Sequence, residues 1–193
     1  MARIMFILLL SVLGCVLASP TCTIEEVNKC LSDNEDFKFM VLGETYPEDD
    51  EHLTKFCLKA LPQLDCAIDF IERCPNSEIS NYLEGLKDQK AALEKLCDTS
   101  LSFRAEYLEH AACMNNKVSA VKGKCADYMN MFANNFKCST GVHNYQVCIE
   151  DSVEECGEKA AEIFRTLYEP KMDINTIFCE GVIKYLKEKG IIS

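Results

Sequence analysis

The sequence predicts an all-α protein made of two tandem helical units that disulfide bonds hold together. Three observations support this prediction: apolar residues recur at helical spacing, twelve cysteines remain after a signal peptide is removed, and one cysteine spacing occurs twice. Strand-like alternation of apolar and polar residues is scarce. We expect residues 1–18 to be the signal peptide, 19–110 the first six-cysteine unit and 111–193 the second.

The first eighteen residues have the three parts of a secretory signal peptide. Met1-Ala-Arg3 is a short basic start, the run from Ile4 to Leu17 is apolar, and Ala18 ends a small-residue cleavage site. This run is shorter than the roughly 20 residues that a membrane-spanning helix needs. We therefore predict a secreted, extracellular protein with no membrane segment. An N-terminal anchor that is retained is the alternative.

Cysteine count and charge restrict the compartment and the partners. Cleavage would remove Cys15 and leave an even number of cysteines, which in an oxidising compartment predicts six disulfides. It would also remove Arg3, so that 31 acidic residues face 19 basic ones. A chain this acidic is repelled by phosphate backbones, and we expect no nucleic-acid partner.

The cysteine spacing indicates an internal repeat. It reads C-x8-C-x7-C-x22-C from Cys57 and C-x9-C-x7-C-x22-C from Cys138, and each unit has two earlier cysteines. The nine-residue frame CAIDFIERC at 66–74 has a counterpart, CIEDSVEEC, at 148–156. The cysteines that we expect to be disulfide-bonded, with their pairing left open, are Cys22, Cys30, Cys57, Cys66, Cys74, Cys97, Cys113, Cys125, Cys138, Cys148, Cys156 and Cys179.

Helical geometry restricts the pairing inside each frame. In a helix, Cys66 and Cys74 would lie about 12 Å apart along the axis. Because a disulfide needs Cα atoms within about 7 Å, the two cysteines of a frame cannot bond to each other. Each frame must instead be bonded to other segments of the chain.

Apolar spacing and helix-ending residues place the helices. One apolar helical face is expected in each unit, formed by Ile79, Tyr82, Leu83 and Leu86 in the first and by Ala160, Ile163, Phe164, Leu167 and Tyr168 in the second. The chain can turn after the frames, at Pro75 and Gly157. A separate last helix would be capped by Asp173 and end before Gly190.

The two units differ most between their second and third cysteines. The first unit has 26 residues there, Leu31 to Phe56, whereas the second has only 12. Acidic clusters at 33–36 and 48–51, with Gly43 and Pro47 between them, indicate a surface excursion rather than another long helix. If the units have different partners, this segment is the first place to expect the difference.

No pattern in the sequence indicates a catalytic or metal site. The closest cysteines are eight residues apart, and His52, His110 and His143 are scattered. The acidic pairs Asp69/Glu72 and Asp151/Glu154 have the spacing of an acid and a base on one helical turn, but charged residues on a solvated helix face are far commoner. We predict a protein that is not an enzyme and has no cofactor or metal.

The partner is left open as an unknown protein or a small hydrophobic ligand. Seven apolar residues are interpreted as core, with a pocket for a hydrophobic ligand as the alternative: Phe37, Phe39, Met40, Met129, Met131, Phe132 and Phe136.

The stretch ECGEKAAEIFRTLYEPKMDINTIFCEGVIKYL, residues 155–186, resembles cysteine-rich secreted proteins of arthropods and nematodes, such as the insect twenty-seven-kilodalton haemolymph glycoprotein family. The chain lacks an N-x-S/T sequon, which departs from a glycoprotein. The resemblance implies a context, an extracellular fluid such as haemolymph, and brings no catalytic residues. We predict a non-enzymatic binding protein of such a fluid. The alternatives are a venom or salivary component that acts on a foreign target, and a carrier of a small hydrophobic ligand.

Overall fold

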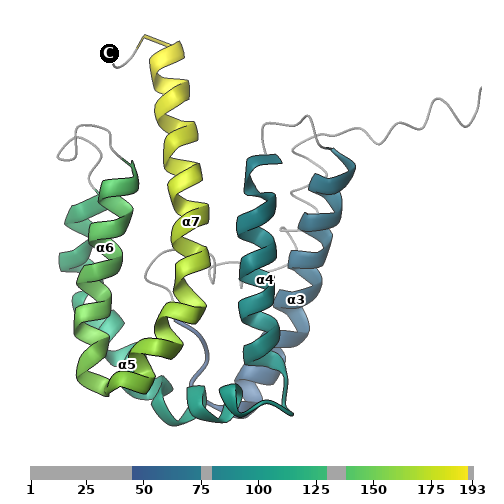
Figure 1. The fold of residues 1–193 in the computed structure, drawn as a ribbon, viewed down its shortest axis with the longest axis vertical. Helices are drawn as coiled ribbons and strands as arrows, with labels where there is room; N and C mark the ends of the chain where they lie inside the picture. Colours follow the sequence, from purple (N-terminus) through teal and green to yellow (C-terminus); the bar gives the residue numbers. More distant parts are fainter. Residues whose placement is uncertain (1–44, 75–79, 130–137, 191–193) are drawn as a thin grey trace, which may run out of the picture.

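The computed structural model describes residues 45–74, 80–129 and 138–190, and all of its regular elements are helices (Figure 1). The prediction of an all-α fold is confirmed. The long helices are α3 (Asp50–Arg73), α4 (Leu83–Cys97), α5 (Ser102–Cys125), α6 (Cys138–Val153) and α7 (Glu158–Glu188). Three short 3-10 turns accompany them: η2 (Ser80–Tyr82), η3 (Ala126–Met129) and η4 (Glu154–Cys156).

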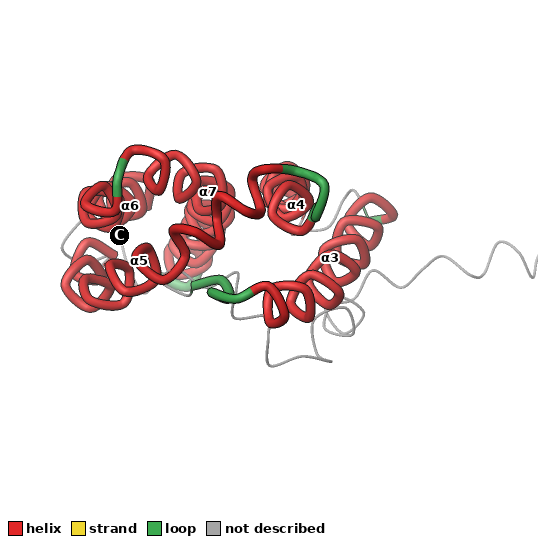
Figure 2. The backbone as a smooth tube through the Cα atoms, turned by 90° about the horizontal axis from the view of Figure 1, so that it is seen from below, coloured by secondary structure: helices red, strands yellow, loops and turns green. Residues whose placement is uncertain are grey.

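Helix α7 has the central place among the long helices. It packs against α4 on one side and against α6 on the other, while α3 packs on α4 and α5 packs on α6 (Figure 1). Seen from below, α6, α7, α4 and α3 follow one another across the molecule, with α5 beside α6 (Figure 2). The helices of the two predicted units therefore meet mainly where α4 lies against α7.

Local sequence signals explain how α3 begins and ends. The Asp49 carboxylate accepts the backbone N–H of His52 at 2.9 Å, and Asp50 and Glu51 place negative charge in the first turn, where the helix dipole favours it. The helix ends at Arg73, with Cys74 as its C-cap. The first frame is thus helical up to its last cysteine. Pro75 and Ile79 lie outside the described residues.

The segment before α3 differs from the expected surface excursion in the part that is described. Tyr46 is buried, and Asn115 donates to its backbone carbonyl at 2.8 Å. The Tyr107 hydroxyl donates to the carbonyl of Pro47 at 3.1 Å. Burial of one large aromatic side chain outweighs the polarity of its neighbours, so residues 45–49 are attached to the core and α3 begins at Asp50. Residues 31–44 lie outside the described part.

Helix α7 overturns the prediction of a separate last helix capped by Asp173. It runs unbroken from Glu158 to Glu188 with Pro170 inside it, so Asp173 lies in the middle of a helix. A proline removes one backbone hydrogen bond, yet Leu167 and Met172 are buried on either side of it and their packing favours continuation. The predicted ends are confirmed: Gly157 has φ 104° directly before α7, and Gly190 has φ 67° after it.

One apolar cluster fills the space between the described helices. It includes side chains from every long helix, among them Leu53, Leu93, Tyr107, Ile149 and Phe164. All five residues of the predicted face in the second unit are buried. The predicted boundary at residue 110 falls inside the continuous helix α5, and the core is shared across it. The division into two units stays a prediction from the sequence repeat.

Candidate binding groove between α5 and α6

Disulfides join neighbouring helices throughout the described part. Cys57–Cys97 joins α3 to the end of α4, and Cys138–Cys179 joins the start of α6 to α7. Cys113–Cys156 and Cys125–Cys148 join α5 to the segment that contains the second frame. The two cysteines of this frame are therefore bonded elsewhere, as the helical spacing predicted. Cys66 and Cys74 are also disulfide-bonded, while Cys22 and Cys30 lie outside the described residues.

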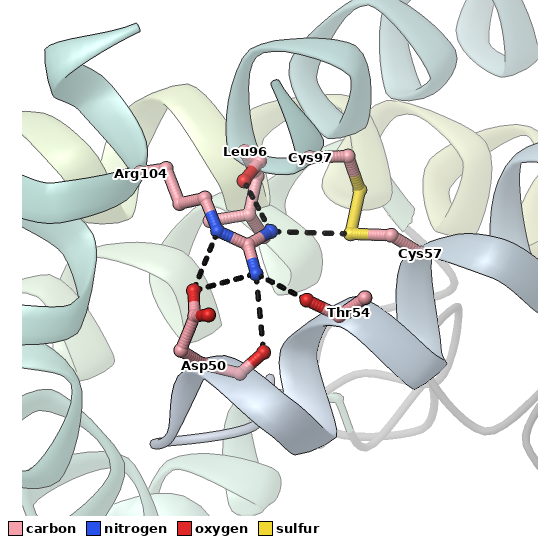
Figure 3. Close-up of a disulfide and its surroundings, with 6 residues drawn as sticks. All are labelled: Asp50, Thr54, Cys57, Leu96, Cys97 and Arg104. Carbon is pink, nitrogen blue, oxygen red and sulfur yellow. Dashed lines mark hydrogen bonds and ion pairs between the residues drawn. A yellow bond between two sulfur atoms is a disulfide. The ribbon is translucent and has the colours of Figure 1, made fainter. Parts of the chain in front are cut away.

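A buried arginine braces the first of these disulfides (Figure 3). The Arg104 side chain is 5% exposed and donates to the Asp50 carboxylate at 2.7 and 2.9 Å. It also donates to the Thr54 hydroxyl at 2.8 Å and to the Leu96 carbonyl at 3.5 Å, and one nitrogen lies 3.9 Å from the Cys57 sulfur. Because these partners belong to α3 and α4, Arg104 of α5 fixes three helices at one point. Its role is structural.

A second buried polar cluster surrounds Tyr46. Its hydroxyl donates to the Leu167 carbonyl and accepts from Gln89, both at 3.2 Å. Burial raises the pKa of Tyr46, so the phenol stays neutral. The ammonium of the fully buried Lys171 lies 4.1 Å from the ring centre of Tyr46 and 4.3 Å from that of Tyr168. These cation–π contacts attach the segment before α3 to α7.

The residues that the sequence offered for catalysis are distributed over α3, α5, α6 and η4. Asp69, Asp151 and Glu154 are exposed, and Glu72 makes an ion pair with Lys87 at 2.9 Å. His52 bonds Asp49 at the start of α3, His110 is half-buried on α5, and His143 is exposed on α6. Of these groups, Asp151 lines the hollow between α5 and α6, and none of the others shares that hollow with it.

The acidic cluster 48–51 is engaged in local contacts. The Glu48 carboxylate accepts from Asn115 at 3.1 Å, and Glu51 accepts from Lys55 at 2.6 Å. Asp49 caps α3 and Asp50 pairs with Arg104. All four carboxylates therefore hold the start of α3 in place. Across the described ranges, no three Asp, Glu, His or Cys side chains are grouped as metal ligands.

A groove between α5 and α6 is the candidate binding site. It has a volume of about 610 Å³ and is lined by Val121, Lys124, Tyr128, Asn144, Val147, Cys148, Asp151, Ser152 and Glu155. Tyr128 is 44% exposed and Val147 is 39% exposed, and both line this groove. No sequence pattern singled out this site, because one wall comes from the end of α5 and η3 and the other from α6 and η4.

Two disulfides fix the walls of this groove. Cys113 near the middle of α5 bonds Cys156, whereas Cys125 at the end of α5 bonds Cys148. The pairing order shows that α5 and α6 run antiparallel, with one bond within the groove and the other just beyond the Glu155 end. The separation of the two walls is therefore set covalently.

Charged groups mark the rim of the groove. Lys117 makes an ion pair with Glu155 at one end. Asp151 and Lys124 make no ion pair with any of the residues that the structure describes. The groove thus presents one negative and one positive group, on opposite walls, that no described side chain neutralises.

Of the residues interpreted as core or as a hydrophobic pocket, Phe37, Phe39, Met40, Met131, Phe132 and Phe136 lie outside the described part, and the Met129 side chain is not described. The carrier alternative therefore stays a prediction. None of the described helices is both long enough and apolar enough to cross a membrane. Comparison of the chain with models of known protein families, with curated proteins and with solved structures found no match.

Proposed function

We propose that this chain is a secreted, non-enzymatic protein that binds a partner through the α5–α6 groove in an extracellular fluid. The observation that carries the proposal is the pair of exposed apolar side chains, Tyr128 and Val147, in a groove whose walls are joined by a disulfide. Exposed aromatic residues in a well-formed hollow are typical anchors of protein interfaces.

The disulfides give this groove a thermodynamic advantage as a binding surface. Association costs free energy when loops and side chains must be ordered, and a surface that is already rigid avoids part of that cost. Cys113–Cys156 and Cys125–Cys148 hold the two helices before any partner arrives. Disulfides of this number also favour an oxidising compartment, in agreement with the predicted signal peptide.

The buried charged groups favour binding over catalysis. Arg104 is enclosed by the partners that fix α3, α4 and α5, and Lys171 is packed between two tyrosine rings. A catalytic site needs such groups to face a cavity that admits substrate. Here they face the interior of the helix assembly and stabilise it.

The test is site-specific photo-crosslinking of the oxidised, full-length secreted protein. A photoreactive amino acid is placed at Val147 in the groove or at Ala105, an exposed control position on the same α5–α6 pair of helices. Haemolymph and gland secretion of the source organism are tested separately, which distinguishes a haemolymph protein from a venom or salivary one.

We expect a discrete adduct from position 147, identified by mass spectrometry, that unlabelled wild-type protein suppresses and Val147→Asp protein does not. Equal labelling from positions 147 and 105, or labelling that both competitors suppress equally, would overturn the proposal.

A further inference from the structure

We propose that the α5–α6 groove takes an extended segment of a partner protein in which a Lys or Arg and a large apolar residue are two positions apart. This inference rests on the proposed function and specifies its ligand. It follows from the length of the groove, from its openness and from the spacing of Val147 and Asp151.

The dimensions favour a stretch of polypeptide over a small molecule. The groove follows α6 and the start of η4 from Asn144 to Glu155, about 16 Å at 1.5 Å per residue. An extended chain rises about 3.3 Å per residue, so the groove accommodates about five residues. Sites for small molecules enclose most of the ligand surface, whereas this hollow is open along its side.

The two groove residues that would contact the partner, Val147 and Asp151, lie on one face of α6. Val147 and Asp151 are four residues apart, close to one helical turn, and both line the groove. Their separation along the axis is about 6 Å. In an extended chain, residues i and i+2 point to the same side and are about 6.6 Å apart. A basic side chain at one of these positions meets Asp151 while an apolar one at the other meets Val147 and Tyr128.

The charges determine which end of the groove takes the basic residue. Asp151 has no described partner, whereas Glu155 is already paired with Lys117. Lys124, which lines the opposite wall next to Cys125, disfavours a second basic residue beside the apolar one. The formal charge of −11 on the whole chain attracts a cationic segment over longer distances.

The experiment measures binding of three fluorescent peptides to the oxidised protein by anisotropy. All three have threonine at the remaining positions, to favour an extended backbone. The central residues are Lys-Thr-Leu in the test peptide, Glu-Thr-Leu in the charge-reversed one and Lys-Thr-Ser in the one without an apolar anchor.

We expect the lysine–leucine peptide to bind about fivefold more tightly than the glutamate–leucine peptide, in the range that one exposed ion pair supplies. The peptide without leucine should show no measurable binding. Asp151→Lys should reverse the preference between the first two peptides. Val147→Asp should abolish binding of both leucine-containing peptides. Glu109→Lys makes the same change of charge at an exposed site on α5 outside the groove and should leave the affinities within twofold.

An unchanged preference in Asp151→Lys protein, or no binding of the lysine–leucine peptide at millimolar concentration, would overturn the inference. Mass measurement after alkylation shows that each variant has kept its disulfides, so misfolding is not mistaken for lost recognition. If the adduct at position 147 forms while the peptides show no preference, the inference fails and the proposed function stands. If both fail, the groove is not the binding surface.

Discussion

Helices α3 and α4 form one disulfide-joined pair and helices α6 and α7 form another, but their disulfides have different surroundings. Cys57–Cys97 and Cys138–Cys179 close loops of nearly equal length, with sequence separations of 40 and 41. Cys57 belongs to the main core and lies beside Arg104. Cys138 and Cys179 form a small separate cluster with Ile183. Among the side chains that the structure describes, the first disulfide therefore belongs to the main apolar cluster and the second to a smaller one.

Reduction of all disulfides should have the largest effect on stability, because it removes the bonds of both helix pairs at once. By the chain-entropy account each disulfide contributes roughly 2 to 4 kcal/mol, and several together equal the stability of an ordinary domain. We expect strong reductant to abolish the cooperative thermal transition, measured by circular dichroism at 222 nm. A cooperative transition that survives reduction would show that the helices are held by packing alone.

Removal of one disulfide at a time measures how much each helix pair depends on its own bond. Loop closure predicts about 4 kcal/mol for either bond, because the two loops have almost the same length. We expect Cys57→Ala with Cys97→Ala to cost about 1 to 3 kcal/mol more than Cys138→Ala with Cys179→Ala, since the first pair also loses contacts with the main apolar cluster and with Arg104. Urea unfolding of both double variants measures the difference. Equal costs would contradict an energetic difference between the two clusters.

Arg104→Met tests how much the Arg104 hydrogen bonds beside Cys57–Cys97 stabilise the protein. The substitution keeps an apolar stem but removes the donors to Asp50, Thr54 and Leu96. Loss of a buried arginine pair costs about 3 to 5 kcal/mol, and we expect about 2 to 4 because the Asp50 side chain is 70% exposed and regains water. Arg73→Ala, at an exposed position on α3, is the control and should cost at most about 0.5 kcal/mol. Similar urea midpoints for the two variants would exclude the proposed role.

Asp173→Asn tests the contact between the two helix pairs and should have the smallest effect on stability. Partial burial and the neighbouring Asp88 raise the pKa of Asp173, in a crevice between α4 and α7 that Lys95 and Glu169 also line. A raised carboxyl pKa means that the folded state binds the proton more tightly than the unfolded state. The contribution of Asp173 to stability should therefore increase as pH falls through the raised value toward the unfolded value near 4, opposite in sign to that of carboxyl groups with lowered pKa values such as Asp49 and Glu162.

Asp173→Asn should remove that gain and, at neutral pH, stabilise the protein by at most a few tenths of a kcal/mol, since the group is largely solvated. Chemical unfolding at several pH values measures the effect. Asp127→Asn, at an exposed site on η3, is the control and should leave the pH dependence intact. If the two variants have the same pH profile, Asp173 is not responsible.

Peptide mapping compares the disulfide pairing of the two units and requires no variant. In the second unit the first cysteine bonds the fifth, the second bonds the fourth and the third bonds the sixth. Cys57–Cys97 has the third-to-sixth pairing in the first unit. If the repeat is complete, the pairing in the second unit predicts that Cys74 bonds Cys22 and that Cys66 bonds Cys30. Proteolysis without reduction, followed by mass spectrometry, identifies the linked peptides. Any other pairing would show that the two units share their cysteine spacing but not their disulfide pairing.

Much of the helical structure could be predicted from local patterns. The buried face of α7 from Ala160 to Tyr168 follows from apolar spacing, and the turns at Gly157 and Gly190 follow from the conformational freedom of glycine. These signals lie within a few residues of the structure that they produce. A sequence therefore reveals them without knowledge of the tertiary fold.

The features that sequence patterns did not predict depend on contacts between residues far apart in the sequence. Lys171 follows Leu167 and Tyr168 on the buried side of α7, but one of the two rings that its ammonium contacts belongs to Tyr46, 125 positions earlier. The same holds for Arg104, whose carboxylate partner is 54 residues away. Continuation of α7 through Pro170 also depends on tertiary packing, which overrides a local signal for a helix end.

The two disulfides between α5 and α6 should make the protein resistant to fragmentation by proteases. A single cut anywhere from residue 126 to residue 147 leaves the two fragments connected through Cys113–Cys156 and Cys125–Cys148. Such a nicked molecule stays in one piece, and only a gel run with reductant separates its fragments. Extracellular fluids are rich in proteases, so a groove with walls crosslinked in this way can outlast damage to the chain that connects them.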